Sequence, residues 1–200
     1  MQTPSFFADA PSIDMIDPLA DLLGAVVDGR ITYTYADAVK LAGHSCPTVA
    51  GAYLMTKVAL NHLHGQETPL RGNIRVEMRD AVDSEVTGVI GNVIGLITGA
   101  AGNGGFKGIG GRFKRNGLMA YGVEQTPTVR FTRLDTGQSI GADFDATVVP
   151  PDQAQGPLMQ ALMSGEASSD DMKKFGDIWQ QRVGAMMTSP ELWPRMVTLG

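Results

Sequence analysis

The chain has 200 residues, of which 43% are hydrophobic and 18% charged, a composition typical of one folded globular unit. Its net charge of −5 argues against a general nucleic-acid-binding protein, because such proteins usually carry a basic surplus. The single cysteine, Cys46, cannot form a disulfide within the chain, so the composition favours a cytoplasmic protein.

The first third of the chain is predicted to be mostly helical. Residues 1–16 are expected to be a loosely ordered lead-in, without the basic and apolar regions of a signal peptide. Asp17 and Thr34 are suitable N-caps, and Pro47 suits the first position of a helix, where its missing N–H has no partner to lose. The predicted helices of this part cover residues 18–27, 35–41 and 47–63.

Strands and helices are both expected in the remainder. Residues 73–81 alternate apolar and charged side chains, which is typical of a half-buried strand. Asp83 or Ser84 is expected to cap a helix that ends at Ile97. The apolar stretch 86–101 around it is interrupted by glycines and too short to span a bilayer, so no membrane contact is predicted. Further strands are predicted at 118–123, 128–134 and 139–148, and further helices at 157–164 and 169–187.

This order of elements predicts an α+β fold with a mostly antiparallel sheet flanked by helices. Residues 1–150 would form the α+β core with its N-terminal helices. Residues 151–200 would form a helical C-terminal extension, capped near Ser169. Its apolar side chains recur at roughly helical spacing, which indicates packing either on the core or on the partner of a homodimer.

The segment Gly43-His44-Ser45-Cys46-Pro47 places an imidazole two residues from the only thiol, directly before a long predicted helix. The N–H groups at a helix N-terminus favour negative charge, so a lowered pKa is expected for the Cys46 thiol. Thiolate and imidazole are usual zinc ligands, and a catalytic zinc site needs three protein ligands. Asp80 and Asp83, between a predicted strand and helix, are the candidates to complete a site with His44 and Cys46.

Two other interpretations of this pair remain open. Cys46 could be a nucleophile with His44 as its base, although two groups on one short loop are poorly placed for a direct hydrogen bond. Alternatively, Cys46 is a small buried hydrophobic residue and His44 a capping or core residue. His62 and His64 form a second pair, but positions two apart on a helix do not face each other. They are expected to be surface or helix-end histidines.

The glycine-rich segment of residues 99–117 carries four basic side chains and could offer backbone N–H groups and cations to an anion. It is not a phosphate-binding P-loop, because no Gly-Lys-Ser/Thr follows the first glycines. It is not a dinucleotide fingerprint either, because Lys107 stands where the third glycine belongs. Asn103, Lys107 and Arg112 are the candidate ligand-binding residues. The segment could act as a lid over His44 and Cys46, or be a mobile loop with solvated charges.

Three motifs resemble the FmdE-like family, named after a component of formylmethanofuran dehydrogenase. They are residues 42–53 around His44 and Cys46, the strand and turn of residues 76–83, and the stretch 98–107 from Thr-Gly to Phe-Lys. Their order and spacing match the family over about residues 35–125. The resemblance implies an α+β core, usually dimeric, with a metal often bound near the His-x-Cys loop, but no defined reaction.

The chain departs from the family pattern at Ala42, where many members have histidine, and at Asp80 and Ala100, where they have cysteine. The resemblance therefore implies a more oxygen-rich site of His44, Cys46 and Asp80 or Asp83, which suits zinc and also admits nickel or iron.

The sequence as a whole predicts a homodimeric metalloprotein that binds or acts on a small anionic metabolite. In that case Zn²⁺ would activate a water molecule, and Lys107 or Arg112 would orient the anion. A non-catalytic accessory or small-molecule-binding protein is the main alternative. Haem ligation through Cys46-Pro47, with His44 nearby, is a further one.

Overall fold

The structure is a computed structural model and describes residues 3–200. A short helix η1 (Ser5–Phe7) precedes a two-stranded antiparallel sheet of β1 (Ile13–Ile16) and β2 (Arg30–Tyr33). The expected lead-in is thus wrong for residues 13–16, where Ile13 and Met15 point into the core. A strand of this length has only two side chains that point into the core, too few to show the alternating pattern from which a strand is predicted. Residues 1–2 lie outside the described part.

Helix α1 (Pro18–Leu22) lies between these strands and is shorter than the helix predicted to residue 27. The carboxylate of Asp17 accepts hydrogen bonds from the N–H groups of Leu19 and Ala20, at 3.0 and 3.2 Å, which confirms Asp17 as the N-cap. The chain then reaches β2 through a turn and the short helix η2 (Val27–Gly29).

Three helices form the centre of the fold, namely α2 (Tyr35–Ala42), α3 (Pro47–His64) and α4 (Thr87–Thr98). The first two match the predicted helices closely. Helix α4 starts two to three residues later than predicted, because residues 82–86 form turns and neither Asp83 nor Ser84 caps the helix. The small residues of α3 permit a close approach, since a Cβ at Gly51 would overlap the ring of Phe144.

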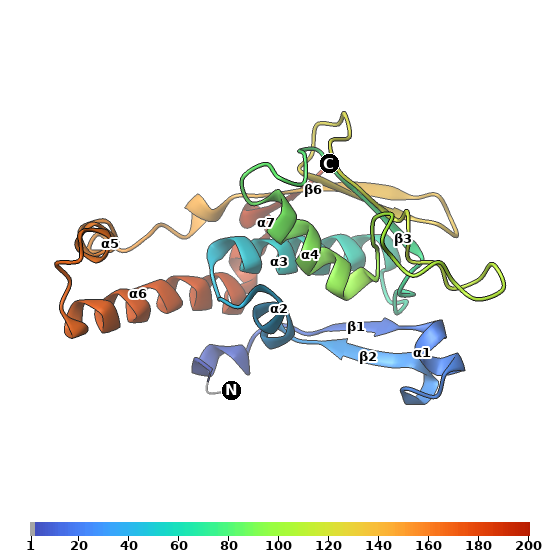
Figure 1. Ribbon diagram of the computed structural model, residues 1–200, viewed down its shortest axis with the longest axis horizontal. Helices are drawn as coiled ribbons and strands as arrows, with labels where there is room; N and C mark the ends of the chain where they lie inside the picture. Colours follow the sequence, from blue (N-terminus) through green and yellow to red (C-terminus); the bar gives the residue numbers. More distant parts are fainter. Residues whose placement is uncertain (1–2) are drawn as a thin grey trace.

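The main sheet has the strand order β4-β3-β5-β6-β7. It consists of β3 (Ile74–Met78), β4 (Met119–Ala120), β5 (Val129–Arg133), β6 (Ser139–Phe144) and β7 (Val197–Leu199). The β3–β4 pair is parallel and the other pairs are antiparallel, with Val76 opposite Phe131 at the centre. This arrangement, with helices against a mostly antiparallel sheet, confirms the α+β class (Figure 1). Strand β7, like β2 of the N-terminal sheet, was not predicted.

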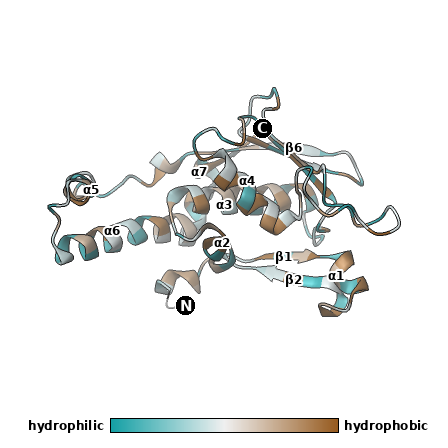
Figure 2. Cartoon of the chain, viewed as in Figure 1, coloured by the Kyte–Doolittle hydropathy of each residue, from teal (hydrophilic) through white to brown (hydrophobic). Residues whose placement is uncertain are grey.

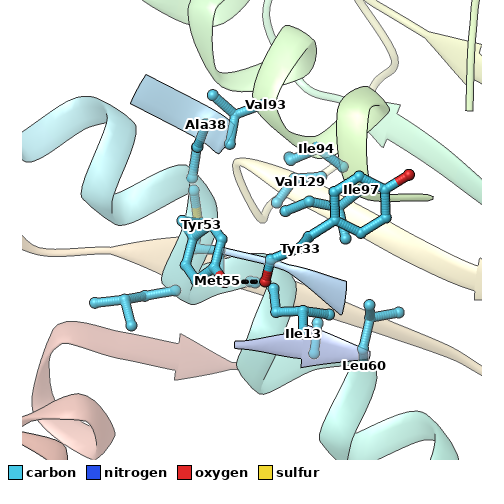
Figure 3. Packing of buried hydrophobic residues seen from close by; sticks show 14 of the residues in the cluster. Ile13, Tyr33, Ala38, Tyr53, Met55, Leu60, Val93, Ile94, Ile97 and Val129 are labelled. Atoms are coloured by element: carbon cyan, nitrogen blue, oxygen red, sulfur yellow. Dashed lines mark hydrogen bonds between the residues drawn. The ribbon is translucent and has the colours of Figure 1, made fainter. Parts of the chain in front are cut away.

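The hydrophobic core lies between α3, α4 and the sheet. Figure 3 shows side chains from the N-terminal hairpin and from these elements packed together. The fully buried Tyr53 of α3 donates a hydrogen bond of 2.8 Å to the carbonyl of Tyr33, and its hydroxyl also lies 2.8 Å from the carbonyl of Pro11. The small N-terminal sheet is thereby attached to the central helix.

The C-terminal part contains η3 (Ala146–Val148), α5 (Gln155–Ser164), α6 (Ser169–Thr188), η4 (Pro190–Leu192) and α7 (Trp193–Met196). Ser168, one residue earlier than predicted, caps α6 in a capping box with Asp171. Helix α5 and the start of α6 extend away from the sheet as an arm (Figure 1). Figure 2 shows mixed polar and apolar residues along α6, and its last turns bury Val183, Met186 and Met187 in the core.

Among residues 3–200, no helix is both long and apolar enough to cross a membrane.

Candidate functional site

The His-x-Cys loop lies between α2 and α3. Cys46 is the N-cap of α3 and Pro47 its first residue, as predicted. The carbonyl of Ser45 accepts hydrogen bonds from Trp179 Nε1 at 3.0 Å and Gln180 Nε2 at 3.1 Å, both on α6. Helix α6 therefore fixes the backbone of this loop.

The two predicted metal ligands differ in their surroundings. His44 is exposed, and its Nδ1 lies 3.0 Å from the carbonyl oxygen of Ala42. When Nδ1 donates this hydrogen bond, the lone pair of Nε2 is free to bind a metal. Cys46 is half-buried and packs against the hydrophobic core. An apolar pocket of about 170 Å³ opens beside the start of α3, but neither residue lines it.

Asp80 and Asp83 do not join these residues in a cluster. Asp80 forms an ion pair of 3.1 Å with Arg79, and Asp83 is exposed on the turn before α4. Within residues 3–200 no three His, Cys, Asp or Glu side chains form a group that could hold a metal ion. Two donors are too few for the predicted zinc centre, so the residues of one chain do not fit it.

The other histidines are both on the last turn of α3. His62 is exposed, whereas His64 is 8% exposed. Burial lowers the pKa of His64, and the nearby charge of Arg133 acts in the same direction.

A second candidate site is a pocket of about 420 Å³ beside the glycine-rich loop, which we call the Arg115 pocket. The loop lies at the end of the molecule opposite α5 (Figure 1). The lining of the Arg115 pocket combines four cationic side chains with apolar side chains. The cationic, leucine and phenylalanine side chains of this lining include Leu70, Arg71, Arg112, Phe113, Lys114, Arg115 and Leu134.

Two of the arginines that line this pocket belong to a buried group of charges around Asp17, which itself does not line the pocket. Asp17 accepts a hydrogen bond of 2.6 Å from Arg115 Nη2 and one of 2.9 Å from Arg71 Nη1. The side chains of Asp17 and Arg115 are 5% and 8% exposed, so this ion pair is shielded from water. Two guanidinium groups thus share one carboxylate and leave one positive charge in excess.

Each of the three guanidinium nitrogens of Arg71 donates one hydrogen bond. Besides Asp17, it donates hydrogen bonds to the carbonyls of Leu96 and Ile97 at 3.0 and 3.2 Å. These carbonyls belong to the last turn of α4, where the helix dipole favours a cation. Arg71 therefore joins the N-terminal segment to the end of α4.

Arg115 uses only a part of its N–H donors. Within residues 3–200 its side chain donates one hydrogen bond, to Asp17, although a guanidinium carries five N–H donors. It lies tightly against the backbone, since a Cβ at Gly72 would overlap its guanidinium. Burial lowers the pKa of Arg115, but an arginine remains charged at every physiological pH.

Two exposed cations complete the lining. Ile109 and Arg112 exchange backbone hydrogen bonds of 2.9 Å across a tight turn, and the Arg112 guanidinium lies 4.8 Å from the centre of the Phe113 ring. Phe113 has φ 61, a conformation rare for a bulky residue and one that occurs at ligand sites. Lys114 follows directly. Arg112, Phe113 and Lys114 thus form the outer wall of the Arg115 pocket.

The predicted ligand-binding residues are only partly brought together. Arg112 lines the Arg115 pocket, while Asn103 and Lys107 are exposed on the same loop outside its lining. His44 and Cys46 do not line this pocket either. Sequence reasoning did not identify Arg71, and it mentioned Arg115 only as one basic residue of the loop. Asp17 was identified only as a helix cap. Charge pairs between distant segments have no local pattern, and Asp17 and Arg115 are 98 positions apart.

Comparison with known protein families and with curated protein sequences finds no match for this chain. The resemblance to the FmdE-like family therefore stays a prediction.

Proposed function

We propose that this protein binds a small anionic molecule in the Arg115 pocket. The observation that carries the proposal is the buried guanidinium of Arg115, which shares Asp17 with Arg71 and retains unpaired N–H donors. A buried cation whose charge is only partly compensated favours an anionic partner. Arg112 and Lys114 add two exposed cations to the same pocket.

The chemistry of the lining favours binding over turnover. The residues around this pocket are arginine, lysine, asparagine, glycine, proline, leucine and phenylalanine. Serine, cysteine, histidine and carboxylate side chains supply most nucleophiles and general acids and bases, and none of these lines the pocket; Lys114 is the lining residue of a type that can also take such a role. This agrees with the alternative of a non-catalytic small-molecule-binding protein.

The double variant Arg112→Gln/Lys114→Gln tests this proposal. We expect it to bind phenyl phosphate about threefold to thirtyfold more weakly than the wild type. The reason is that each exposed charge contributes roughly 0.3–1 kcal/mol to such a contact. Isothermal titration calorimetry at low salt measures the affinity, and added salt should weaken binding to the wild type.

The matched control is Lys173→Gln/Lys174→Gln, which removes two exposed charges from α6 in the arm. It should leave the affinity at its wild-type value. The proposal is overturned if both double variants bind equally, or if the wild type binds none of inorganic phosphate, phenyl phosphate and benzoate.

Metal binding by His44 and Cys46 is a second proposal, supported by the hydrogen bond that leaves His44 Nε2 free. A third ligand would have to come from a rearranged loop or from the second copy in a homodimer. We expect protein produced without a chelating tag to contain zinc, and His44→Ala and Cys46→Ser to lose it. Elemental analysis measures this, with the exposed His62→Ala as control. Equal zinc in all four proteins would rule out these ligands.

A further inference from the structure

We infer that the ligand of the Arg115 pocket is an organic phosphate monoester with an apolar body, rather than an inorganic anion. This inference rests on the proposed function and specifies its ligand. Three properties of the pocket support it: its size, its apolar wall and the number of its cations.

The size of the pocket exceeds what one oxyanion needs. Its volume of about 420 Å³ lies within the range of roughly 300–1,000 Å³ found for sites that bind organic ligands. A lone phosphate held by Arg115 would leave most of this volume to water.

The apolar wall adjoins the cationic group. Leu70 directly precedes Arg71 in the chain, and the N–H of Leu134 donates a hydrogen bond of 2.9 Å to the carbonyl of Asn73. Both leucines line the pocket, yet they are 38% and 40% exposed. With Phe113 they offer an apolar surface that a ligand could cover, next to the guanidinium groups that would hold its anionic end. Covering such surface is favourable in proportion to its area.

The cations favour a phosphate over a carboxylate. Arg112, Lys114 and Arg115 line the pocket in addition to Arg71, which is already engaged by Asp17 and α4. A phosphate monoester carries a charge of about −1.5 to −2 at neutral pH and three acceptor oxygens. It can therefore accept hydrogen bonds from three separate cationic groups, whereas a carboxylate has one charge and two oxygens.

Titration of the wild-type protein with three probes tests this inference. Phenyl phosphate should bind about tenfold more tightly than inorganic phosphate, because its ring covers the apolar wall. It should also bind more tightly than benzoate, which has the ring without the phosphate. Leu134→Ser and Leu70→Ser should each weaken phenyl phosphate binding about threefold and leave phosphate binding unchanged.

The control for the leucine variants is Leu41→Ser, an exposed leucine of α2 that does not line the pocket. Thermal unfolding of each variant shows whether it remains folded. Equal affinity for phosphate and phenyl phosphate would overturn the inference while leaving the proposed function intact. Tighter binding of benzoate than of phenyl phosphate would likewise overturn the inference and leave the proposed function intact. Absence of binding by all three probes would overturn both.

Discussion

Asp17→Asn is expected to lower the free energy of unfolding by about 3–5 kcal/mol, because it leaves two guanidinium groups without their shared carboxylate. Asp17 is 4% exposed and accepts hydrogen bonds from both Arg71 and Arg115. An asparagine side chain still has an oxygen that can accept the capping hydrogen bonds of α1, so the cap is kept while the charge and one of the two acceptor oxygens are lost. Urea denaturation measures the difference.

The control is Asp9→Asn, which changes an exposed aspartate near the N-terminus and should alter stability by less than about 0.5 kcal/mol. Asp17→Ala also removes the cap and should cost roughly 1 kcal/mol more than Asp17→Asn. A loss below about 1 kcal/mol for Asp17→Asn would show that the two arginines do not depend on this carboxylate.

The pH dependence of this difference has a definite sign. Burial alone would raise the pKa of Asp17, but the hydrogen bond from Arg71 and the charge of Arg115 outweigh it and lower the pKa below 3.8. A carboxyl with a lowered native pKa stabilises the fold fully above its unfolded pKa. The stability difference between wild type and Asp17→Asn should therefore be constant at neutral pH and shrink as the pH falls below about 3.8.

The elements that the sequence predicted well are those with strong local signals. Helix α3 has Pro47 at its first position and a long run of residues suited to a buried helix. Strand β3 alternates apolar and charged residues over its whole length. In both cases the local pattern and the tertiary packing favour the same structure.

The missed strands β1, β2 and β7 are short and depend on pairing with another strand. β1 and β2 have four residues each and pair with each other, whereas β7 has three residues and pairs with β6 more than fifty positions away. Such segments extend because a neighbouring strand offers unpaired backbone groups, and no local period reveals this. The length of α1 was overestimated because Leu22 and Leu23 continue a helical pattern but are exposed.

The candidate sites likewise combine features that have a local sequence signal with features that have none. The sequence singled out the glycine-rich loop and Arg112, because clustered glycines and cations form a local signal, and Arg112 lines the pocket beside this loop. It did not identify the buried group of Asp17, Arg71 and Arg115, which three separate segments bring together. The predicted cluster of His44, Cys46, Asp80 and Asp83 likewise required distant segments to meet, and spacing along the chain does not determine that.

Gly29→Ala is expected to lower the free energy of unfolding by about 2–4 kcal/mol. Gly29 has φ +64, where a side chain costs roughly 1–2 kcal/mol. A Cβ there would also lie 2.7 Å from the carbonyl oxygen of Asp17, which cannot move freely because the Asp17 N–H donates a 2.7 Å hydrogen bond to Gly29. Overpacking of this kind adds about 1–3 kcal/mol. Urea denaturation again provides the measurement.

Two further alanine variants separate the cost of the positive φ from the cost of the close contact. Gly24 has nearly the same conformation, φ +66, but a Cβ there would have no neighbour within 4 Å, so Gly24→Ala should lose only about 1 kcal/mol. Gly176 in α6 is also open and has no positive φ, so Gly176→Ala should gain roughly 0.5–1 kcal/mol from helix propensity. If Gly29→Ala and Gly24→Ala lose the same amount, the close approach of Gly29 to the Asp17 carbonyl does not constrain the fold. Asp17 would then be held in place by its arginine partners and by the capping hydrogen bonds of α1.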